Sequence, residues 1–500
     1  MQRNNSAADA EHRHAAARAL PAWLRASVPA SALQLAMLFA ALVAVPFSRG
    51  IDNDFWWHLR TGEFILSHGI PQHDPYSWTR AGQPWVAHEW LAEVFIYVAQ
   101  SAIGYAATLL IFGFLTIGAL MLVYSLGRRS GAGTKPLVVL MLFAVVVMST
   151  FVTVRPQVFS WLMFAAFLYV LSRHYDGERA PLWALPPLMA VWVNLHLGFY
   201  FGLMLVGCWL AALCFDAVRG REVALRTPFV VALACVFATF ANPAGPAILA
   251  YPFRYLFDSQ FANANVAEWQ RPQLIDPSDA PIFVFALLLS LALISRTRPR
   301  PFLWLVSLAV IVLSMQALRN APYAVLVALP VVAAAASRRW GAASASRDSS
   351  LRVPLLAAAP LVIAIAAMLG PVAALRAGVP LSIGAPTEAG YPGPEAAYVR
   401  AHHPGAGMYN GYSEGGYLID ALYPDVPVFI DGRTDFYGDD LLNDYLQIHK
   451  ARVGWQALLD SYGVQVVLIG QKAELATALS TDSGWQLEFT GPTAVVYARK

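Results

Sequence analysis

The sequence predicts a polytopic α-helical membrane protein of about eleven transmembrane helices, followed by a soluble α/β domain. Three observations predict this class. Hydrophobic residues make up 58% of the 500 residues and charged residues only 13%, about half the charged share of soluble domains. Long apolar runs recur up to residue 375, and short basic clusters separate them. The net charge of +3 gives no indication of nucleic acid binding, because the basic residues stand in these short clusters between apolar runs.

The apolar runs are the expected transmembrane helices. They lie near residues 31–48, 104–126, 136–151, 157–172, 181–193, 197–217, 227–241, 280–295, 301–315, 321–337 and 354–375. Several are shorter than the roughly 20 residues of a straight span, so flanking residues must complete them. Arginines precede the first run as in a signal peptide, but no small-residue cleavage site follows, so we expect a retained helix.

The loops between the runs alternate in charge, which predicts the orientation of the chain. Every second loop is basic, and these loops hold Arg128, Arg129, Lys135, Arg173, Arg179, Arg219, Arg221, Arg226, Arg296, Arg298, Arg300, Arg338, Arg339, Arg347 and Arg352. By the positive-inside rule they face the cytoplasm. The N-terminus is then inside, whereas loops 49–88 and 242–279 and the C-terminal tail are outside.

We therefore expect a cytoplasmic tail over residues 1–30, a transmembrane domain over 31–375 and an extracytoplasmic domain over 376–500. The last part contains no spanning run. It alternates helix-like stretches with short apolar strands, which is typical of an α/β domain. The helices are expected at 394–403, 439–450 and 472–480, and the strands at Val426–Ile430, Val464–Ile469 and Ala494–Ala498.

The first outer loop carries the strongest candidates for chemistry, in the segment DNDFWWHLRTGEFILSHGIPQHDPYSWT at 52–79. Membrane anchoring explains its tryptophans, although Trp57 is also a candidate for substrate contact. Anchoring does not explain the neighbouring acids. A carboxylate near lipid loses solvation, which raises its pKa and suits it to take a proton from a hydroxyl. Asp54 is therefore the first catalytic candidate and Asp52 the second, whereas His58 and His73 are expected to be hydrogen-bonding residues.

The same loop ends at His88-Glu89-Trp90, where an amphipathic helix is expected to begin. Glu89 has two interpretations, which the sequence leaves open. It is either a second carboxylate that faces Asp54 as a catalytic group or metal ligand, or an acid that caps the helix and is stabilised by its dipole.

Further polar residues recur at the outer ends of the spans, where they are costly unless they are paired or functional. They are Arg155, Asn194, His196, Asn242, Arg319 and Asn320. Together they predict a shared wet cavity. Arginine presents a planar fork of donors suited to phosphate oxygens, so Arg155 and Arg319 are candidates for holding a lipid phosphate. Glu268, Trp269 and Arg271, in the loop NANVAEWQRPQ, are expected to fold over this cavity as a gate.

Together these segments resemble the GT-C superfamily of integral membrane glycosyltransferases. The resemblance spans nearly the full chain. The motifs that carry it are DNDFWWHLRTGEFILSHGIPQHDPYSWT, HEWLAE, NVAEWQRP and GGYLI…PVFIDGRTDFY. They look like those of a bacterial group that is mostly uncharacterised and distantly similar to protein mannosyltransferases, lipid A aminoarabinose transferases and oligosaccharyltransferase catalytic subunits.

The resemblance implies that a sugar passes from a polyprenyl-phosphate carrier to an acceptor outside the cytoplasmic (inner) membrane, with inversion at the anomeric carbon. The acceptor is a glycan, a lipid or a protein. Asp54 would be the essential acid of the first outer loop, and arginines would stabilise the departing phosphate. Some members of the superfamily use a divalent cation and others do not, and no ligand cluster in this sequence decides between them.

The tail carries a second likeness. Tyr412-Ser413-Glu414-Gly415-Gly416-Tyr417, followed by Asp431-Gly432-Arg433, sits where oligosaccharyltransferases carry a WWDYG motif that reads the acceptor peptide. Here the two tryptophans are absent and Glu414 stands for the aspartate, which argues against peptide N-glycosylation. Glu414 and Tyr417 are candidates for binding another acceptor. The alternative is a tight glycine turn with Asp431 and Arg433 paired at a strand end.

Two other classes of function remain as alternatives. A transporter or flippase for a lipid-linked saccharide would be expected to show internal repeats and interrupted helices near the midplane. The two halves of this sequence show no such similarity, and the polar residues gather on one side of the membrane, which favours the enzyme. A non-catalytic membrane protein that handles the same lipid is the third interpretation.

Overall fold

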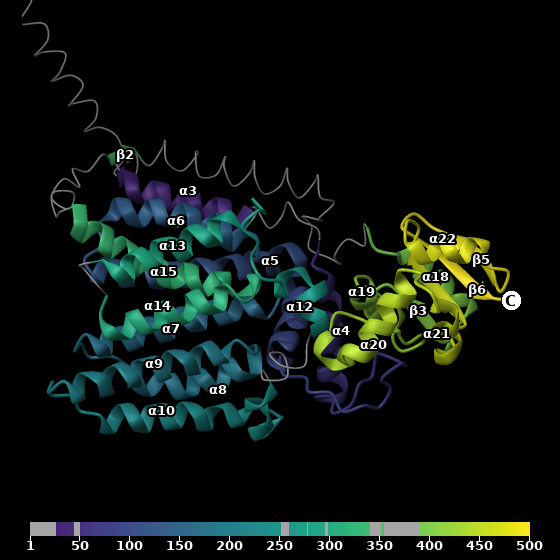
Figure 1. Ribbon diagram of the computed structural model, residues 1–500, viewed down its shortest axis with the longest axis horizontal. Helices are drawn as coiled ribbons and strands as arrows, with labels where there is room; N and C mark the ends of the chain where they lie inside the picture. The colour runs from purple at the N-terminus through teal and green to yellow at the C-terminus, as the bar shows by residue number, and fades with distance from the viewer. Residues whose placement is uncertain are drawn as a thin grey trace, which may run out of the picture.

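The computed structural model describes residues 27–44, 51–251, 260–277, 279–295, 299–340, 352–354 and 390–500. Within these ranges a bundle of roughly parallel and antiparallel helices lies beside a smaller α/β part that contains the C-terminus (Figure 1). The helix that follows the first apolar run, α4, lies between the two. This arrangement places the first outer loop where the bundle meets the tail.

The bundle is built from the apolar runs. Its helices are α3 (Ala30–Ala44), α5 (Trp90–Arg129), α6 (Thr134–Ser149), α7 (Gln157–Tyr175), α8 (Leu185–Leu195), α9 (Phe199–Val218), α10 (Arg226–Ala238), α13 (Ala280–Ile294), α14 (Pro301–Ser314) and α15 (Ala321–Trp340). Each predicted run up to residue 340 thus forms a helix. The predicted run at 354–375 lies outside the described residues.

The surface of this bundle suits lipid rather than water. Phe114, Phe237 and Leu287 are 58% to 61% exposed. Three helices of the described ranges, Trp90–Arg129, Phe199–Val218 and Leu318–Arg339, are long and apolar enough to cross a membrane, and the other apolar helices are shorter. Large apolar side chains at such exposure would be unfavourable in water. The chain is accordingly a multi-pass membrane protein.

Helix α5 consists of two parts over its 40 residues. Gly104 has a left-handed backbone (φ 79°) and breaks the helix, which a residue with a side chain would resist. The part after Gly104 matches the predicted run at 104–126. The part before Gly104 begins at Trp90, directly after Glu89. It places Glu89, at the end of the first outer loop, where the bundle meets the tail.

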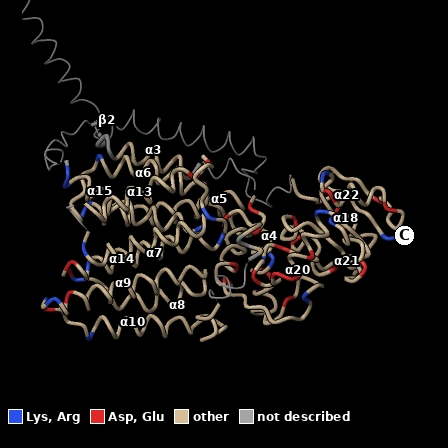
Figure 2. Tube along the Cα trace, viewed as in Figure 1, with Lys and Arg blue, Asp and Glu red and all other residues tan. Residues whose placement is uncertain are grey.

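The basic loops gather at one end of the bundle (Figure 2). Arg129 pairs with Glu178, Arg300 pairs with Asp176, and the Gly133 amide donates to Ser337 Oγ at 2.8 Å. These contacts join four loops that the charge alternation predicted to share one side. The other end of the bundle faces the tail. Which face of the membrane each end meets stays a prediction.

Helix α4 (Asn53–His68) begins at the acidic motif. Asp52 is its N-cap, and its Oδ1 accepts a hydrogen bond from the Asp54 amide at 3.0 Å. An aspartate cap satisfies an amide that the first turn would leave unpaired. Gly69 ends the helix with a positive φ of 85°. The helix therefore fixes Asp54 in its first turn, with Phe55 buried beneath it.

The tail forms an α/β fold around one sheet. Its elements are α18 (Gly393–His402), β3 (Met408–Asn410), α19 (Gly415–Leu422), α20 (Thr434–His449), α21 (Trp455–Tyr462), β4 (Val466–Gly470), α22 (Glu474–Thr481), β5 (Trp485–Thr490) and β6 (Ala494–Arg499). The strand order is β3-β4-β6-β5, with β3 parallel to β4 and the other neighbours antiparallel. Elsewhere β1 (Ser27–Pro29) pairs antiparallel with β2 (Arg352–Pro354).

One predicted strand of the tail is wrong. Val426–Ile430 joins no strand of the sheet, although most of it is buried. Its main chain bonds with the side chain of Asn410, which accepts from the Phe429 amide and donates to the Ile430 carbonyl, both at 2.8 Å. The Val428 amide bonds to the Tyr76 carbonyl at 3.0 Å. The segment is apolar because it is buried between the sheet and the first outer loop.

Candidate active site

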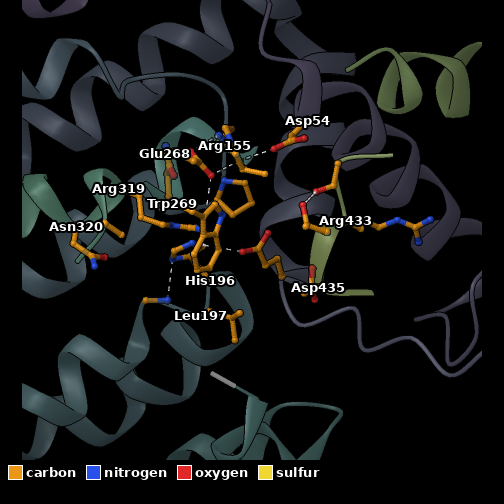
Figure 3. Close-up of a pocket in the computed structure, with 18 of the residues that line it drawn as sticks. Asp54, Arg155, His196, Leu197, Glu268, Trp269, Arg319, Asn320, Arg433 and Asp435 are labelled. Carbon is orange, nitrogen blue, oxygen red and sulfur yellow. Dashed lines mark hydrogen bonds and ion pairs between the residues drawn. The ribbon is translucent and has the colours of Figure 1, made fainter. Parts of the chain in front are cut away.

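A cavity of about 1340 Å³ opens where the bundle, α4 and the tail meet. Its walls come from segments far apart in the sequence: the start of α4, the loop before α7, the α8–α9 connection, the short helices η5 (Ala267–Trp269) and η6 (Leu318–Asn320), and the tail. Figure 3 shows the charged side chains that converge on it. The sequence predicted such a shared cavity from its outward-facing polar residues.

Arg155 lies at the centre of an ionic cluster. Its Nη2 donates to Asp54 Oδ2 at 2.5 Å, and its Nη1 donates to Glu268 Oε2 at 3.1 Å. Its Nε lies 3.7 Å from Asp52 Oδ1. Carboxylates from two distant segments therefore surround one guanidinium, and burial of the three acids together is tolerated because this cation compensates them.

The environment of Asp54 suits proton transfer near neutral pH. Burial raises the pKa of Asp54 to about 7, with Arg155 opposing the rise and the nearby acids Asp52 and Glu268 adding to it. Removing water disfavours the charged carboxylate more than the single arginine favours it. A base whose pKa lies near the working pH is effective in taking a proton from a hydroxyl.

Arg319 stands on the bundle side of the cavity. Its guanidinium lies 4.3 Å above the Trp269 ring, and its Nη1 lies 3.7 Å from Glu268 Oε1. Burial alone would raise the pKa of Glu268, but Arg155 and Arg319 outweigh it and hold that pKa below its usual value. Glu268 therefore stays ionised and fixes both arginines. Exposed Arg271 lines the cavity next to this pair.

Glu89 belongs to a second cluster in the same cavity. Its Oε1 lies 3.5 Å from His88 Nε2 and 3.6 Å from His196 Nε2. Burial alone would raise the pKa of Glu89, but the neighbouring histidines, His88 foremost, hold it below its usual value. No cap hydrogen bond forms from the Glu89 side chain at the start of α5. The two carboxylates of the predicted pair thus line one cavity, yet Glu89 contacts histidines rather than Asp54.

The tautomer of His196 follows from its neighbours. The Gly198 amide donates to His196 Nδ1 at 2.9 Å, so Nδ1 carries no proton. Burial lowers the pKa of His196 to about 4, which leaves a neutral ring at pH 7 with its proton on Nε2. That N–H points toward Glu89 and the cavity. Asp54 and Glu89 are therefore carboxylates whose environments push their pKa values apart, as in sites that divide acid and base roles.

The structure brings most of the predicted site residues together. Those that line the cavity are Asp52, Asp54, Trp57, Glu89, Arg155, His196, Glu268, Arg271 and Arg319. Asn194, Asn242, Glu414 and Tyr417 are not among the lining residues. Asn194 Oδ1 accepts from Trp90 Nε1 at 2.6 Å, which fastens the end of α8 to the start of α5. Tyr417 is buried and stacks on Tyr391. Glu414 is the N-cap residue of α19.

Several residues that line the cavity were not among the predicted site residues. Tyr412, Gly432, Thr434 and Asp435 form the tail wall of the cavity. They reach it only because the tail folds back on the first outer loop, which no local pattern predicts. His88 was detectable in principle, because it stands directly before Glu89 in the HEWLAE motif.

The described residues offer no ready metal site. Within the described ranges, no three His, Cys, Asp or Glu side chains are arranged to hold a metal ion. The three acids that lie near one another in the cavity surround the guanidinium of Arg155 instead; they are Asp52, Asp54 and Glu268. The question of a divalent cation, which the sequence left open, therefore has no positive indication in the geometry.

Known proteins are similar to this chain in fold and not in sequence. No model of a protein family matches the sequence, and no curated protein matches it. Solved structures do match. The oligosaccharyltransferase of Archaeoglobus fulgidus, tethered with an acceptor peptide, aligns with a TM-score of 0.58 and 13% identity over 94% of this chain and 74% of that one.

Two other transferases match in the same way. ArnT from Cupriavidus metallidurans, bound to undecaprenyl phosphate, aligns with a TM-score of 0.50 and 13% identity over 93% of this chain and 96% of its own. The mycobacterial arabinofuranosyltransferase AftD aligns with a TM-score of 0.52 and 13% identity over 95% of this chain and 42% of its own. At such identities the likeness establishes architecture. This chain has the fold of the GT-C membrane glycosyltransferases, as its sequence motifs indicated.

Proposed function

We propose that this protein is a membrane glycosyltransferase that moves a sugar from a polyprenyl-phosphate carrier to an extracytoplasmic acceptor, with inversion. One observation carries the proposal: Asp54, Arg319 and Arg271 line a single cavity. Burial raises the pKa of Asp54 to about 7, which suits it to act as a base there. The fold supports the proposal, because structural neighbours contain dolichol-phosphate or undecaprenyl phosphate. Base and phosphate-binding groups are the two requirements of this transfer.

In the proposed reaction, Asp54 accepts the proton of an acceptor hydroxyl. The hydroxyl oxygen attacks the anomeric carbon while the bond from that carbon to the phosphate oxygen breaks, and the phosphate departs with the bonding electrons. A single in-line displacement inverts the anomeric configuration. Arg319 and Arg271 stabilise the charge that grows on the departing phosphate.

Arg155 has a different part in this scheme from the one its sequence position suggested. Its donors point to Asp54 and Glu268, with Asp52 nearby. The guanidinium is thus taken up by carboxylates, and we assign it to holding Asp54 in place. Phosphate binding falls to Arg319, whose Glu268 contact is long at 3.7 Å, together with Arg271.

The sidedness belongs to the same proposal. The residues that line the cavity lie where the bundle meets the tail, and Figure 2 shows the basic loops at the other end of the bundle. The positive-inside rule places such loops in the cytoplasm, so the cavity and the tail would face outward from the inner membrane of a bacterium. The parts are then a cytoplasmic tail at 1–30, a transmembrane domain at 31–375 and an outer domain at 376–500.

The proposal is tested with the purified full chain in lipid nanodiscs, supplied with radiolabelled polyprenyl-phosphate sugars and a membrane extract as acceptor source. The expected result is transfer of the label with release of polyprenyl phosphate. In sealed vesicles, movement of the intact donor across the bilayer with its sugar still attached would instead identify a flippase. Donor that is neither consumed nor moved would support a non-catalytic protein.

Replacing Arg319 by alanine is expected to lower kcat/KM for the donor by about 10- to 100-fold, because hydrogen bonds to charged groups contribute about 1.5–3 kcal/mol. Arg300→Ala is the matched control, since Arg300 pairs with Asp176 at the opposite end of the bundle. Steady-state kinetics with varied donor measures the effect. Equal kcat/KM in the two variants would remove Arg319 from phosphate binding.

The rate is expected to depend on pH through Asp54. Its pKa of about 7 means that protonation removes the base at lower pH. kcat/KM should therefore rise about tenfold per pH unit up to about pH 7 and level off above it, because kcat/KM reports the ionisation of the free enzyme. The measurement is kcat/KM for the donor from about pH 5.5 to about pH 8.5. A rate that is constant across this range would contradict the assignment of Asp54 as base.

A further inference from the structure

The turn formed by Asp431, Gly432 and Arg433, here called the DGR turn, lies against the first turn of α4. The sequence singles out this motif, and the proposed reaction gives it no part. It belongs to the tail, about 380 residues away along the chain from the acid that it touches. Its contacts with Asp54 set it apart from an ordinary surface turn.

Gly432 touches Asp54 directly. A methyl group added at Gly432 would lie 2.1 Å from Asp54 Oδ1, closer than any real contact. The main chain of the turn therefore lies against that oxygen, and a side chain at position 432 would displace the Asp54 carboxylate or the turn. Gly416 makes a similar approach to the preceding residue, because a methyl group there would lie 2.5 Å from the Asn53 carbonyl oxygen. Two tail glycines thus hold the start of α4.

Arg433 anchors the turn from the side away from the cavity centre (Figure 3). Its side chain is 2% exposed. Nη1 donates to Asp74 Oδ1 at 2.8 Å, while Nε and Nη2 donate to the two oxygens of Asp431 at 2.8 and 2.7 Å. The guanidinium also lies 4.6 Å from the centre of the Trp85 ring. A buried bidentate pair of this kind fixes orientation as well as position.

The surrounding contacts leave the turn little freedom. Side chains of the first outer loop donate hydrogen bonds to main-chain carbonyls of the tail, from Trp78 Nε1 to Met408 at 3.0 Å and from Thr79 Oγ1 to Phe429 at 2.6 Å. Asp74, which binds Arg433, also accepts from the Ser77 amide at 2.9 Å. The turn and the loop therefore form one packed unit around Asp54.

We propose that the DGR turn is a positioning element for Asp54: Gly432 covers Oδ1 and restricts rotation of the carboxylate, so that Oδ2 stays directed at Arg155 and the cavity. Arg433 holds the turn in this position. The proposal rests on the proposed function in taking Asp54 as the base. By covering one oxygen, the turn also contributes to the burial that raises the pKa of Asp54.

The test compares Gly432→Ala with Gly470→Ala in the full chain. Gly470, in β4 of the same tail, has no atom within 4 Å of an added methyl group. Gly432→Ala is expected to lower kcat by about 10- to 100-fold, because small displacements of a reacting group cost this much. The donor KM should stay within about twofold, since phosphate binding is not touched. Gly470→Ala should behave as the wild type does.

A second measurement reports on Asp54 without substrate. A carbodiimide reacts with the protonated carboxyl, so mass spectrometry of the labelled peptide gives the pH midpoint of Asp54. The added methyl group should hold the turn away and admit water, which moves the midpoint of Gly432→Ala to lower pH. Arg433→Lys, which loosens the turn without a new contact, should move the midpoint in the same direction if Gly432→Ala does not fold.

Wild-type kcat together with a wild-type midpoint in a folded Gly432→Ala would overturn the proposal. The same holds for an unchanged midpoint in Arg433→Lys. Failure of the proposed function has a different signature. The wild type itself would then transfer no sugar, while the labelling midpoints would still decide whether the turn positions Asp54.

Discussion

Asp54→Asn is expected to lower sugar transfer by about 100- to 10,000-fold, the usual contribution of a positioned general base. The asparagine amide keeps the shape of the side chain and cannot accept the proton of the acceptor hydroxyl. Arg155 can still donate to the asparagine amide oxygen in place of Asp54 Oδ2, and it keeps its hydrogen bond to Glu268. The measurement is single-turnover transfer in nanodiscs, with donor binding followed separately.

Asp52→Asn is the matched control for this prediction. Asparagine caps a helix as well as aspartate does, so the hydrogen bond that Asp52 accepts from the Asp54 amide is retained. Asp52 Oδ1 lies 3.7 Å from Arg155 Nε, so we expect its charge to affect Asp54 only indirectly, through Arg155. We expect this variant to retain most of the transfer. Equal losses in the two variants would mean that the net charge of the cluster matters, and that Asp54 is not the base.

The fold could be predicted largely from the sequence, because the signals are long and local. Apolar runs, alternating basic loops and the α/β pattern of the tail each depend on residues close together in the chain. Helix α5 shows the limit. The amphipathic helix after Glu89 and the run at 104–126 were both predicted, but the sequence did not predict that they meet at Gly104 as one broken helix from Trp90 to Arg129.

The site could be predicted as a set of residues but not as an arrangement. Asn194 and His196 are both polar and stand two residues apart at the C-terminal end of α8. Asn194 is helical and bonds to Trp90, whereas His196 ends the helix with an extended backbone (φ −170°, ψ 146°) and reaches the cavity. A small difference in helix length decides which of the two lines the site.

The glycines of the tail show why contacts between distant segments could not be predicted from the sequence. The sequence offered a tight turn as the reason for Gly415 and Gly416. The structure gives close packing instead, because methyl groups there would lie 2.2 Å from the Ile430 carbonyl oxygen and 2.5 Å from the Asn53 carbonyl oxygen. The contact between Gly416 and Asn53 joins segments several hundred residues apart in the chain. No pattern within either segment predicts it.

The largest expected loss of stability comes from Arg433→Met. Removing one member of a buried ion pair costs about 3–5 kcal/mol, since the remaining charge stays buried without compensation. Here two carboxylates, Asp74 and Asp431, would lose their cation, and both side chains are fully buried. The methionine fills most of the volume, so the loss of charge pairing dominates. Thermal unfolding of the full chain in detergent, followed by tryptophan fluorescence, should show a clearly lowered midpoint.

Arg400→Met is the control, because it makes the same substitution at an exposed pair. Arg400 lies 3.4 Å from Asp425, and the two side chains are 46% and 52% exposed. Exposed pairs contribute little because water and salt screen them, so the unfolding midpoint should stay close to that of the wild type. If Arg433→Met unfolded at the same temperature as Arg400→Met, the junction between the first outer loop and the tail would not depend on this ion network. The tail would then be held beside Asp54 by the other hydrogen bonds to the first outer loop and by glycine packing.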